Sequence, residues 1–149
     1  MSIELDTNSL KNLRIFNKLD AKRLKLVAMM AERLHYLPGQ RIVSEGDIPD
    51  TIFIILSGEI ELTRSTPCGE MYALSLGTGA LFGDVPMLCD KSYLSNATAK
   101  TDVVVLGLGR ELFFELLQNV PEFAVAVCKD IAGRCYQLII RIIDTKSQG

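Results

Sequence analysis

Apolar residues recur at three different spacings along the 149-residue chain. The first segment, residues 6–34, has helical spacing, in which positions i, i+3, i+4 and i+7 share one face. The residues that follow this spacing most closely are Leu24, Val27, Ala28 and Ala31. Asp20 precedes them and carries a side-chain oxygen suited to a helix N-cap, so we expect two helices that are divided at Asp20.

The second segment, residues 35–109, consists of short apolar runs that are separated by turn residues. The runs are Thr51–Leu56, Glu59–Thr63, Tyr72–Leu76 and Val103–Leu108. Glycines recur every 6 to 12 residues, at Gly39, Gly46, Gly58, Gly69, Gly77 and Gly83. This pattern is typical of an antiparallel β-roll or jelly roll. The first three glycines are expected to supply tight turns with positive φ rather than ligand contacts.

Helical spacing returns in the third segment, residues 110–145. A short helix over 110–119 precedes Pro121, which suits the first turn of a long helix of about 35 Å. This helix carries a heptad seam formed by Ala124, Cys128, Ile131, Cys135, Leu138 and Ile142. A second apolar row contains Val125, Ala132, Ile139 and Ile143. Either both faces fold back onto the domain, or the seam forms a parallel two-fold homodimer, which we favour.

Composition narrows the class of protein. Apolar residues make up 48% of the chain and the mean hydropathy is +0.24, which is enough for one globular domain over residues 1–149. The net charge of −2 argues against a nucleic-acid partner for this chain. No apolar stretch reaches the ~18 residues of a membrane span, and no secretory signal is evident. The four cysteines form no CxxC pair and are expected to be buried or incidental thiols of a cytoplasmic protein.

Motifs for catalysis and metal binding are missing from the sequence. His35 is the only histidine, whereas a metal site on a β-roll would use several. No Ser/His/Asp set can be assembled around His35, and no GxxxxGK[ST] phosphate loop is present. We therefore expect no metal site, no catalytic residue and no enzymatic activity.

Several segments share the spacing of one known family. They are Pro38–Asp47, Asp50, Phe53–Leu56, Gly58, Ile60, Phe82–Leu88 and Ala99–Asp102. Together they resemble the cyclic nucleotide-binding domain of catabolite-activator-like regulators, cyclic-nucleotide-dependent kinases and gated channels. The resemblance extends over nearly the whole chain. It implies a mainly β fold with flanking helices, a phosphate-binding cassette at residues 82–99, and cAMP or cGMP as the ligand.

The resemblance also implies which residues would touch the ligand. They are Phe82, Gly83, Asp84, Val85, Tyr93, Leu94 and Ser95. Asp84 occupies the place of a glutamate and would either accept from a ribose hydroxyl or cap the following turn. Tyr93 occupies the place of the arginine that binds the phosphate, and Leu94 that of a hydroxyl residue. If the register is shifted by one residue, Leu94 takes the arginine position and Ser95 the hydroxyl position, so a hydroxyl is restored but a cation is still missing.

The missing arginine is the main feature of this cassette. No arginine lies between Arg64 and Arg110, and Lys91, the only cation in the loop, is expected to be solvated. Tyr93 would either cover the pocket with its ring or, as we favour, pack on the roll. Losing a charge-assisted hydrogen bond to an anion costs about 1.5–3 kcal/mol, which is tenfold or more in affinity.

We therefore expect a regulatory or sensor domain that binds cAMP or cGMP weakly or takes another small ligand. The alternative is a domain that keeps the fold and serves only in homodimerisation or protein interaction. Weak binding is expected only if no other guanidinium, such as that of Arg64 or one from a neighbouring subunit, lies at the cassette.

Overall fold

The structure is a computed structural model that describes residues 7–69 and 71–147. Its centre is a roll of two four-stranded antiparallel sheets, in the orders β1-β8-β3-β6 and β2-β7-β4-β5. The strands of the first sheet are β1 (Glu32–Tyr36), β8 (Val103–Gly109), β3 (Thr51–Ser57) and β6 (Leu81–Phe82). Those of the second are β2 (Arg41–Val43), β7 (Asn96–Ala99), β4 (Ile60–Ser65) and β5 (Met71–Leu76). The expected antiparallel roll is thereby confirmed.

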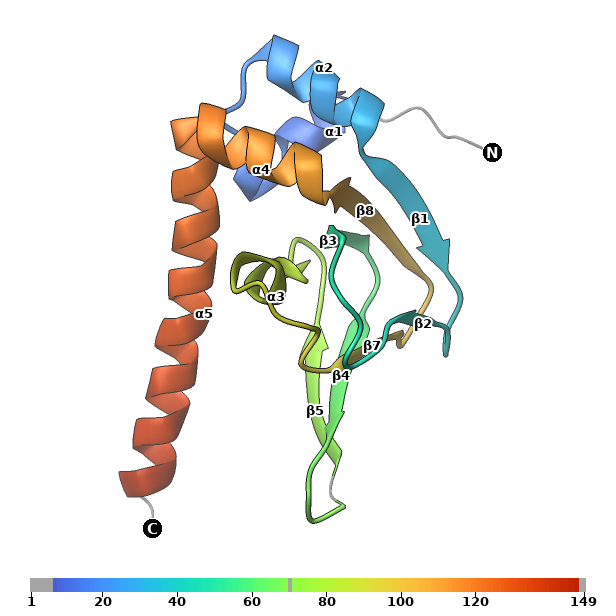
Figure 1. The fold of residues 1–149 in the computed structure, drawn as a ribbon, viewed down its shortest axis with the longest axis vertical. Coiled ribbons are helices and arrows are strands. Elements are labelled where there is room, and N and C mark those ends of the chain that lie inside the picture. Colours follow the sequence, from blue (N-terminus) through green and yellow to red (C-terminus); the bar gives the residue numbers. More distant parts are fainter. Residues whose placement is uncertain (1–6, 70, 148–149) are drawn as a thin grey trace.

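Helices precede, interrupt and follow the roll. They are α1 (Thr7–Lys11), the 3₁₀ turn η1 (Arg14–Phe16), α2 (Ala21–Met30), α3 (Asp84–Leu88), α4 (Arg110–Asn119) and α5 (Pro121–Ser147). Figure 1 shows α1, α2 and α4 gathered at one end of the roll, while α5 runs down one side past α3. No helix in the described part of the chain is long and apolar enough to cross a membrane.

Two hydrophobic clusters explain why β3 and β8 read as continuous apolar runs. Alternate residues of a strand point to opposite faces of its sheet. In β3, Ile52 and Ile54 pack against the helices, whereas Phe53 and Ile55 pack between the two sheets. Both faces of the first sheet are therefore covered, so the middle positions of its central strands are apolar on both sides.

The helical cluster is built around aromatic rings. Phe16 and Phe123 are stacked with centroids 5.9 Å apart, and Phe113 meets Phe123 edge to face at 6.1 Å. Phe16 and Phe113 are fully buried, and Phe123 is nearly so. Because these three rings come from η1, α4 and α5, their contact fixes where α5 begins relative to the roll.

Local signals in the sequence correspond to observed features. The side chain of Asp20 accepts a hydrogen bond of 2.8 Å from the backbone N–H of Arg23, which confirms the N-cap. Gly39, Gly46 and Gly58 have φ values of +89°, +92° and +93°. Gly58 is needed sterically as well, because a Cβ there would lie 2.2 Å from the Asp102 carbonyl oxygen.

The expected end of the first helical segment at residue 34 was wrong. The helix α2 ends at Met30, and residues 32–34 form the start of β1. Glu32 pairs with Gly107 and Leu34 with Val105 of β8, so strand pairing overrides the local helical spacing. Asp6, where that segment was expected to begin, lies outside the described residues. Of the two alternatives for the cysteines, buried or incidental thiols, burial was wrong, because all four are exposed.

Candidate functional site

The cassette places a short helix against the open end of the roll. Gly83, with φ of +87°, lies between β6 and α3 and is the N-cap residue of α3. A Cβ at Gly83 would lie 3.2 Å from the Thr51 carbonyl oxygen and 3.3 Å from the hydroxyl of Tyr93. Glycine is thus required both by the left-handed turn and by the close approach of Tyr93 to the backbone.

Asp84 is the only charged or polar side chain among the fully buried described residues, with 1% of its surface exposed. Its Oδ2 accepts a hydrogen bond from Nη2 of Arg134 on α5. It makes no side-chain cap for α3, so the capping interpretation of Asp84 is wrong. Its Oδ1 is buried and accepts no hydrogen bond from the described residues. This oxygen is therefore suited to a ligand that donates a hydrogen bond into the cassette.

Arg134 joins the cassette to α5. Besides Asp84, its guanidinium contacts Oδ2 of Asp130 one turn earlier on α5, at 3.0 Å from Nη2. Burial lowers the pKa of Arg134, but the hydrogen bond and charge of Asp84, with those of Asp130, raise it by more. The guanidinium therefore stays charged and balances the buried carboxylate of Asp84.

Tyr93 packs on the roll, the arrangement we favoured, and does not offer its hydroxyl to an open pocket. Its side chain is 7% exposed, and its hydroxyl donates to the Thr51 carbonyl oxygen at 3.1 Å. The backbone N–H of Tyr93 donates to the Asp47 carbonyl oxygen, and its carbonyl oxygen accepts from the backbone N–H of Gly46, both at 2.9 Å. Burial raises the pKa of Tyr93 to about 12, with smaller contributions from the negative charges of Asp50 and Asp47.

The other expected ligand residues fall into two groups. Phe82 is buried and stacked on Phe53 with centroids 4.9 Å apart, so it belongs to the core. Leu94 is 58% exposed, while Val85 and Ser95 are half-buried. The structure brings the backbone of Gly83 next to Tyr93, as expected, but Leu94 turns outward.

A guanidinium that the sequence interpretation left outside the cassette does reach it. Nη1 of Arg64, on β4, donates to the Leu94 carbonyl oxygen at 3.0 Å. The expectation that no arginine lies at the cassette was wrong, because Arg64 reaches it from a different strand. Strand periodicity was the available signal, since Arg64 shares a face with Ile60 and Leu62. Lys91 is exposed and lines an open hollow together with Pro86 and Arg110.

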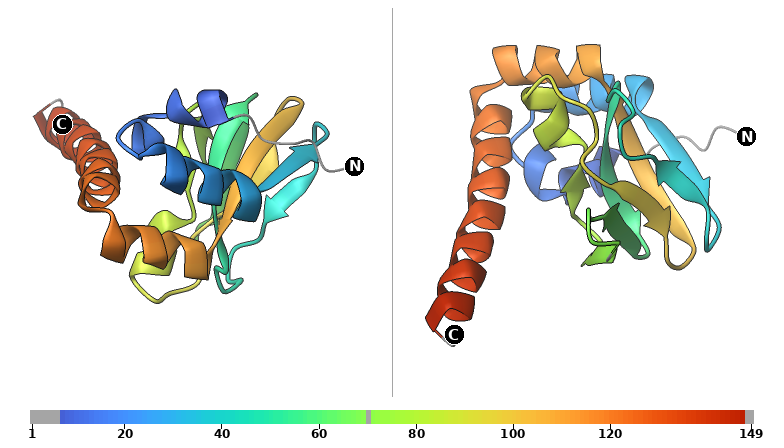
Figure 2. Two further views of the ribbon diagram at one scale, coloured as in Figure 1. Left: turned by 90° about the horizontal axis from the view of Figure 1, so that it is seen from above. Right: turned by 60° about the horizontal axis from the view of Figure 1, so that its bottom comes forward.

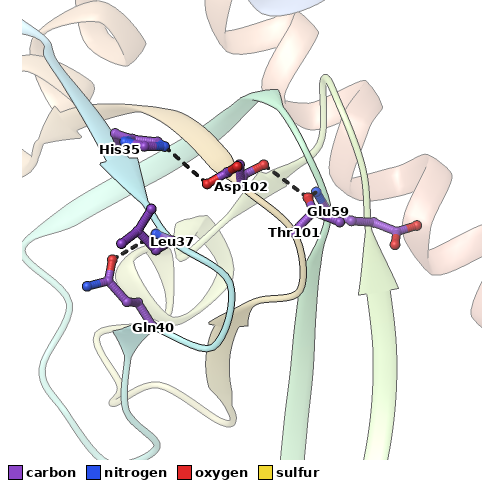
Figure 3. Close-up of polar contacts among 6 residues, drawn as sticks. All are labelled: His35, Leu37, Gln40, Glu59, Thr101 and Asp102. Carbon is purple, nitrogen blue, oxygen red and sulfur yellow. Dashed lines mark hydrogen bonds and ion pairs between the residues drawn. The ribbon is translucent and has the colours of Figure 1, made fainter.

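Polar contacts also join the turns of the roll that lie outside the cassette. Figure 3 shows His35 facing Asp102, with Thr101 and Glu59 close by. Nε2 of His35 lies 3.5 Å from Oδ1 of Asp102, and the hydroxyl of Thr101 accepts from the backbone N–H of Glu59 at 3.1 Å. The side chains of His35 and Asp102 are 58% and 70% exposed. These contacts tie strand ends together on the surface and do not include any cassette residue.

The second half of α5 packs against no other described part of the chain. Phe123 and Val127, in its first two turns, are buried against the helical cluster. Every residue from Cys135 to Ser147 is exposed, and the helix stands beside the roll in Figures 1 and 2. The exposed large apolar residues of this half include Leu138, Ile139, Ile142 and Ile143, each between 53% and 59% exposed, and also Tyr136 and Ile140. The alternative in which both faces fold back onto the domain was wrong.

Sequence comparisons agree with this architecture. The family model of the cyclic nucleotide-binding domain matches residues 33–120. The cyclic AMP receptor protein of Thermus thermophilus is 28% identical over 126 residues, which cover 84% of this chain and 58% of that protein. A cAMP-dependent protein kinase regulatory subunit of Aspergillus niger is 33% identical over 96 residues, or 64% of this chain and 23% of that one. The chain thus spans less than two thirds of these relatives.

Solved structures extend the comparison to the fold. The catabolite activator protein of Thermus thermophilus superposes with a TM-score of 0.77 at 25% identity, covering 89% of this chain and 63% of that one. The regulatory subunit of a cAMP-independent protein kinase A from Trypanosoma brucei gives 0.72 at 22% identity, covering 89% and 49%. At that lower identity the likeness shows the fold alone. The family match, the roll and the cassette together establish that this chain belongs to the regulatory cyclic nucleotide-binding domain family.

Proposed function

We propose that this chain is a non-enzymatic sensor domain that binds a cyclic nucleotide weakly through residues 82–99. The single observation that supports it best is the buried Oδ1 of Asp84, which accepts no hydrogen bond from the described residues. A ribose hydroxyl is a donor of the right kind for this oxygen. Weak rather than tight binding is proposed because Tyr93, at the place of the family's arginine, is buried and neutral.

A ligand at this position would lie next to the contact that holds α5. Oδ2 of Asp84 already binds Arg134, so a donor at Oδ1 would share the same carboxylate. Occupation of the cassette would therefore change how firmly α5 is held, which gives the domain a route from ligand to helix. This route is part of the proposal.

Isothermal titration of the 149-residue chain with cAMP and cGMP tests the proposal. We expect affinities of roughly a tenth-millimolar, because one forked cation contact is worth tenfold or more. The analogue 2′-deoxy-cAMP should bind about tenfold more weakly than cAMP, since it lacks the hydroxyl proposed to meet Asp84. Low-micromolar cAMP affinity would contradict weak binding, and equal affinity for the deoxy analogue would contradict the role of Asp84.

A second candidate function is favoured by one separate observation, the exposed apolar half of α5. In this alternative the domain is a ligand-independent homodimerisation module that retains the fold. Absence of heat with millimolar cyclic mono- and dinucleotides, together with a stable dimer, would favour it over the sensor. A sensor that dimerises through α5 is compatible with both observations.

A further inference from the structure

Arg64 is a positive charge without a carboxylate partner at the edge of the cassette. Within residues 7–69 and 71–147, the basic partners of the ion pairs are His35, Lys100, Arg110 and Arg134, and none of the pairs includes Arg64. Its side chain uses one donor on the Leu94 carbonyl oxygen at 3.0 Å. A guanidinium has five N–H donors in a planar fork, so most of them remain free for an anion.

The position of Arg64 follows from sheet pairing. Along β4, Ile60 and Leu62 pack in the cluster between the two sheets, and the period of two places Arg64 on the same side of the strand, at its exposed end. The ladder between β4 and β7 ends at the pair Thr63–Asn96. Beyond that pair β4 continues beside the residues that precede β7, which is why Arg64 meets Leu94.

Two other arginines near the cassette are held in ion pairs, and Lys91 lines the hollow at Pro86 and Arg110. Arg134 is bound to Asp84 and Asp130. Arg110 pairs with Asp90 at 3.1 Å and lies over the ring of Phe114. Among the described arginines that reach the cassette, Arg64 and Arg41 form no ion pair. Arg41 donates to the side chain of Asn96 at 3.1 Å, whereas Arg64 donates to the backbone of Leu94, next to Tyr93.

We propose that Arg64 of β4 supplies the cation for the ligand's cyclic phosphate, in place of an arginine from the cassette itself. This inference rests on the proposed function, and it names the anion-binding residue of that site. The ligand would lie between two fixed groups, with its phosphate at Arg64 and its ribose hydroxyl at Asp84. A guanidinium that reaches the anion from the neighbouring strand, while one donor stays on Leu94, binds it less completely than a dedicated fork.

Titrations of wild type and Arg64→Gln with cAMP and with adenosine test this assignment. Arg64→Gln should weaken cAMP binding about tenfold or more, because it removes the charge that faces the phosphate. Binding of adenosine, which carries no phosphate, should stay the same in both proteins. Arg64→Lys should fall between the two, since lysine keeps the charge without the fork. Arg33→Gln, which removes an exposed arginine of β1, is the matched control and should bind cAMP as wild type does.

The outcomes separate this inference from the function on which it rests. If wild type binds neither cAMP nor cGMP at millimolar concentration, both are overturned. If wild type binds cAMP and Arg64→Gln binds it equally well, only the role of Arg64 is overturned. If Arg64→Gln loses adenosine and cAMP to the same extent, Arg64 merely holds the loop at Leu94, which also overturns the assignment.

Discussion

Tyr93 shows how the burial of one residue changes the chemistry expected of a position. Its ring covers Gly83, and its hydroxyl binds the Thr51 carbonyl oxygen at 3.1 Å. A buried phenol with a satisfied hydroxyl contributes to stability and offers nothing to an anion. Under the proposed function, the cation for a phosphate comes from another strand, where Arg64 donates to the Leu94 carbonyl oxygen.

The hydrogen bond of Tyr93 can be measured by Tyr93→Phe. We expect a loss of about 0.5–1.5 kcal/mol in the free energy of unfolding, the net value of one hydrogen bond. Urea denaturation followed by circular dichroism measures it. Tyr136→Phe, at a 64% exposed position on α5, is the control and should leave stability unchanged. Equal stability of Tyr93→Phe and wild type would show that the bond to Thr51 contributes nothing.

Because of Tyr93, we also expect the free energy of unfolding to depend on pH in the alkaline range. Burial raises the pKa of Tyr93 from 10.0 to about 12, so between these values the folded chain keeps a proton that the unfolded chain loses. Stability should therefore fall as the pH rises from 10 toward 12. Burial also raises the pKa of Tyr36, so that residue adds to the loss. The fall should be smaller in Tyr93→Phe and unchanged in Tyr136→Phe when denaturation is repeated across this range.

At the scale of elements, α5 is the helix of which one half is not covered by the rest of the described chain. Its first turns are buried by Phe123 and Val127, whereas residues 135–147 are all exposed. Exposed leucine and isoleucine side chains at heptad spacing are characteristic of a coiled-coil seam. We expect a second copy of this chain to cover them.

Light scattering at tens of micromolar tests this interface. Wild type should be a dimer, and Leu138→Glu should shift the equilibrium to monomer by tenfold or more, because two like charges would replace two apolar seam residues. Lys146→Glu, beyond the seam, is the control and should remain dimeric. A monomeric wild type at this concentration would contradict the proposed dimer.

At the scale of the whole molecule, one ion pair joins the cassette to α5 across 50 residues of sequence. The carboxylate of Asp84 is buried, while the side chain of Arg134 is 37% exposed. Removing the guanidinium would leave a buried charge without its partner. We therefore expect the pair to contribute to the stability of the cassette and to hold α5 beside it.

Arg134→Gln should lower the free energy of unfolding by about 1.5–3 kcal/mol, the value of a charged hydrogen bond. Adding Asp84→Asn to this variant should recover part of the loss, because the buried charge is then gone as well. Chemical denaturation of the two single variants and the double variant measures the coupling. Arg141→Gln, an exposed arginine on the same helix, should have no effect. Additive losses in the double variant would exclude an energetic link between Asp84 and Arg134.

The sequence by itself determined the elements and most of their turns. The spacing of apolar residues predicted α4 at residues 110–119 and the long helix from Pro121, and both were confirmed. The N-cap at Asp20 and the positive φ of Gly58 were confirmed as well. These features depend on neighbours within a few residues, so local propensity and periodicity are enough to specify them.

Only the tertiary structure decided which side chains form the site. Arg64 meets Leu94 across 30 residues, and Arg134 meets Asp84 across 50. Neither contact has a local signature, because it depends on strand order and on where α5 crosses the cassette. The same reason explains why residues 32–34 became a strand, since β8 pairs with them although their own spacing is helical. Periodicity specifies the face of a residue, whereas packing of the sheets and helices decides what that face meets.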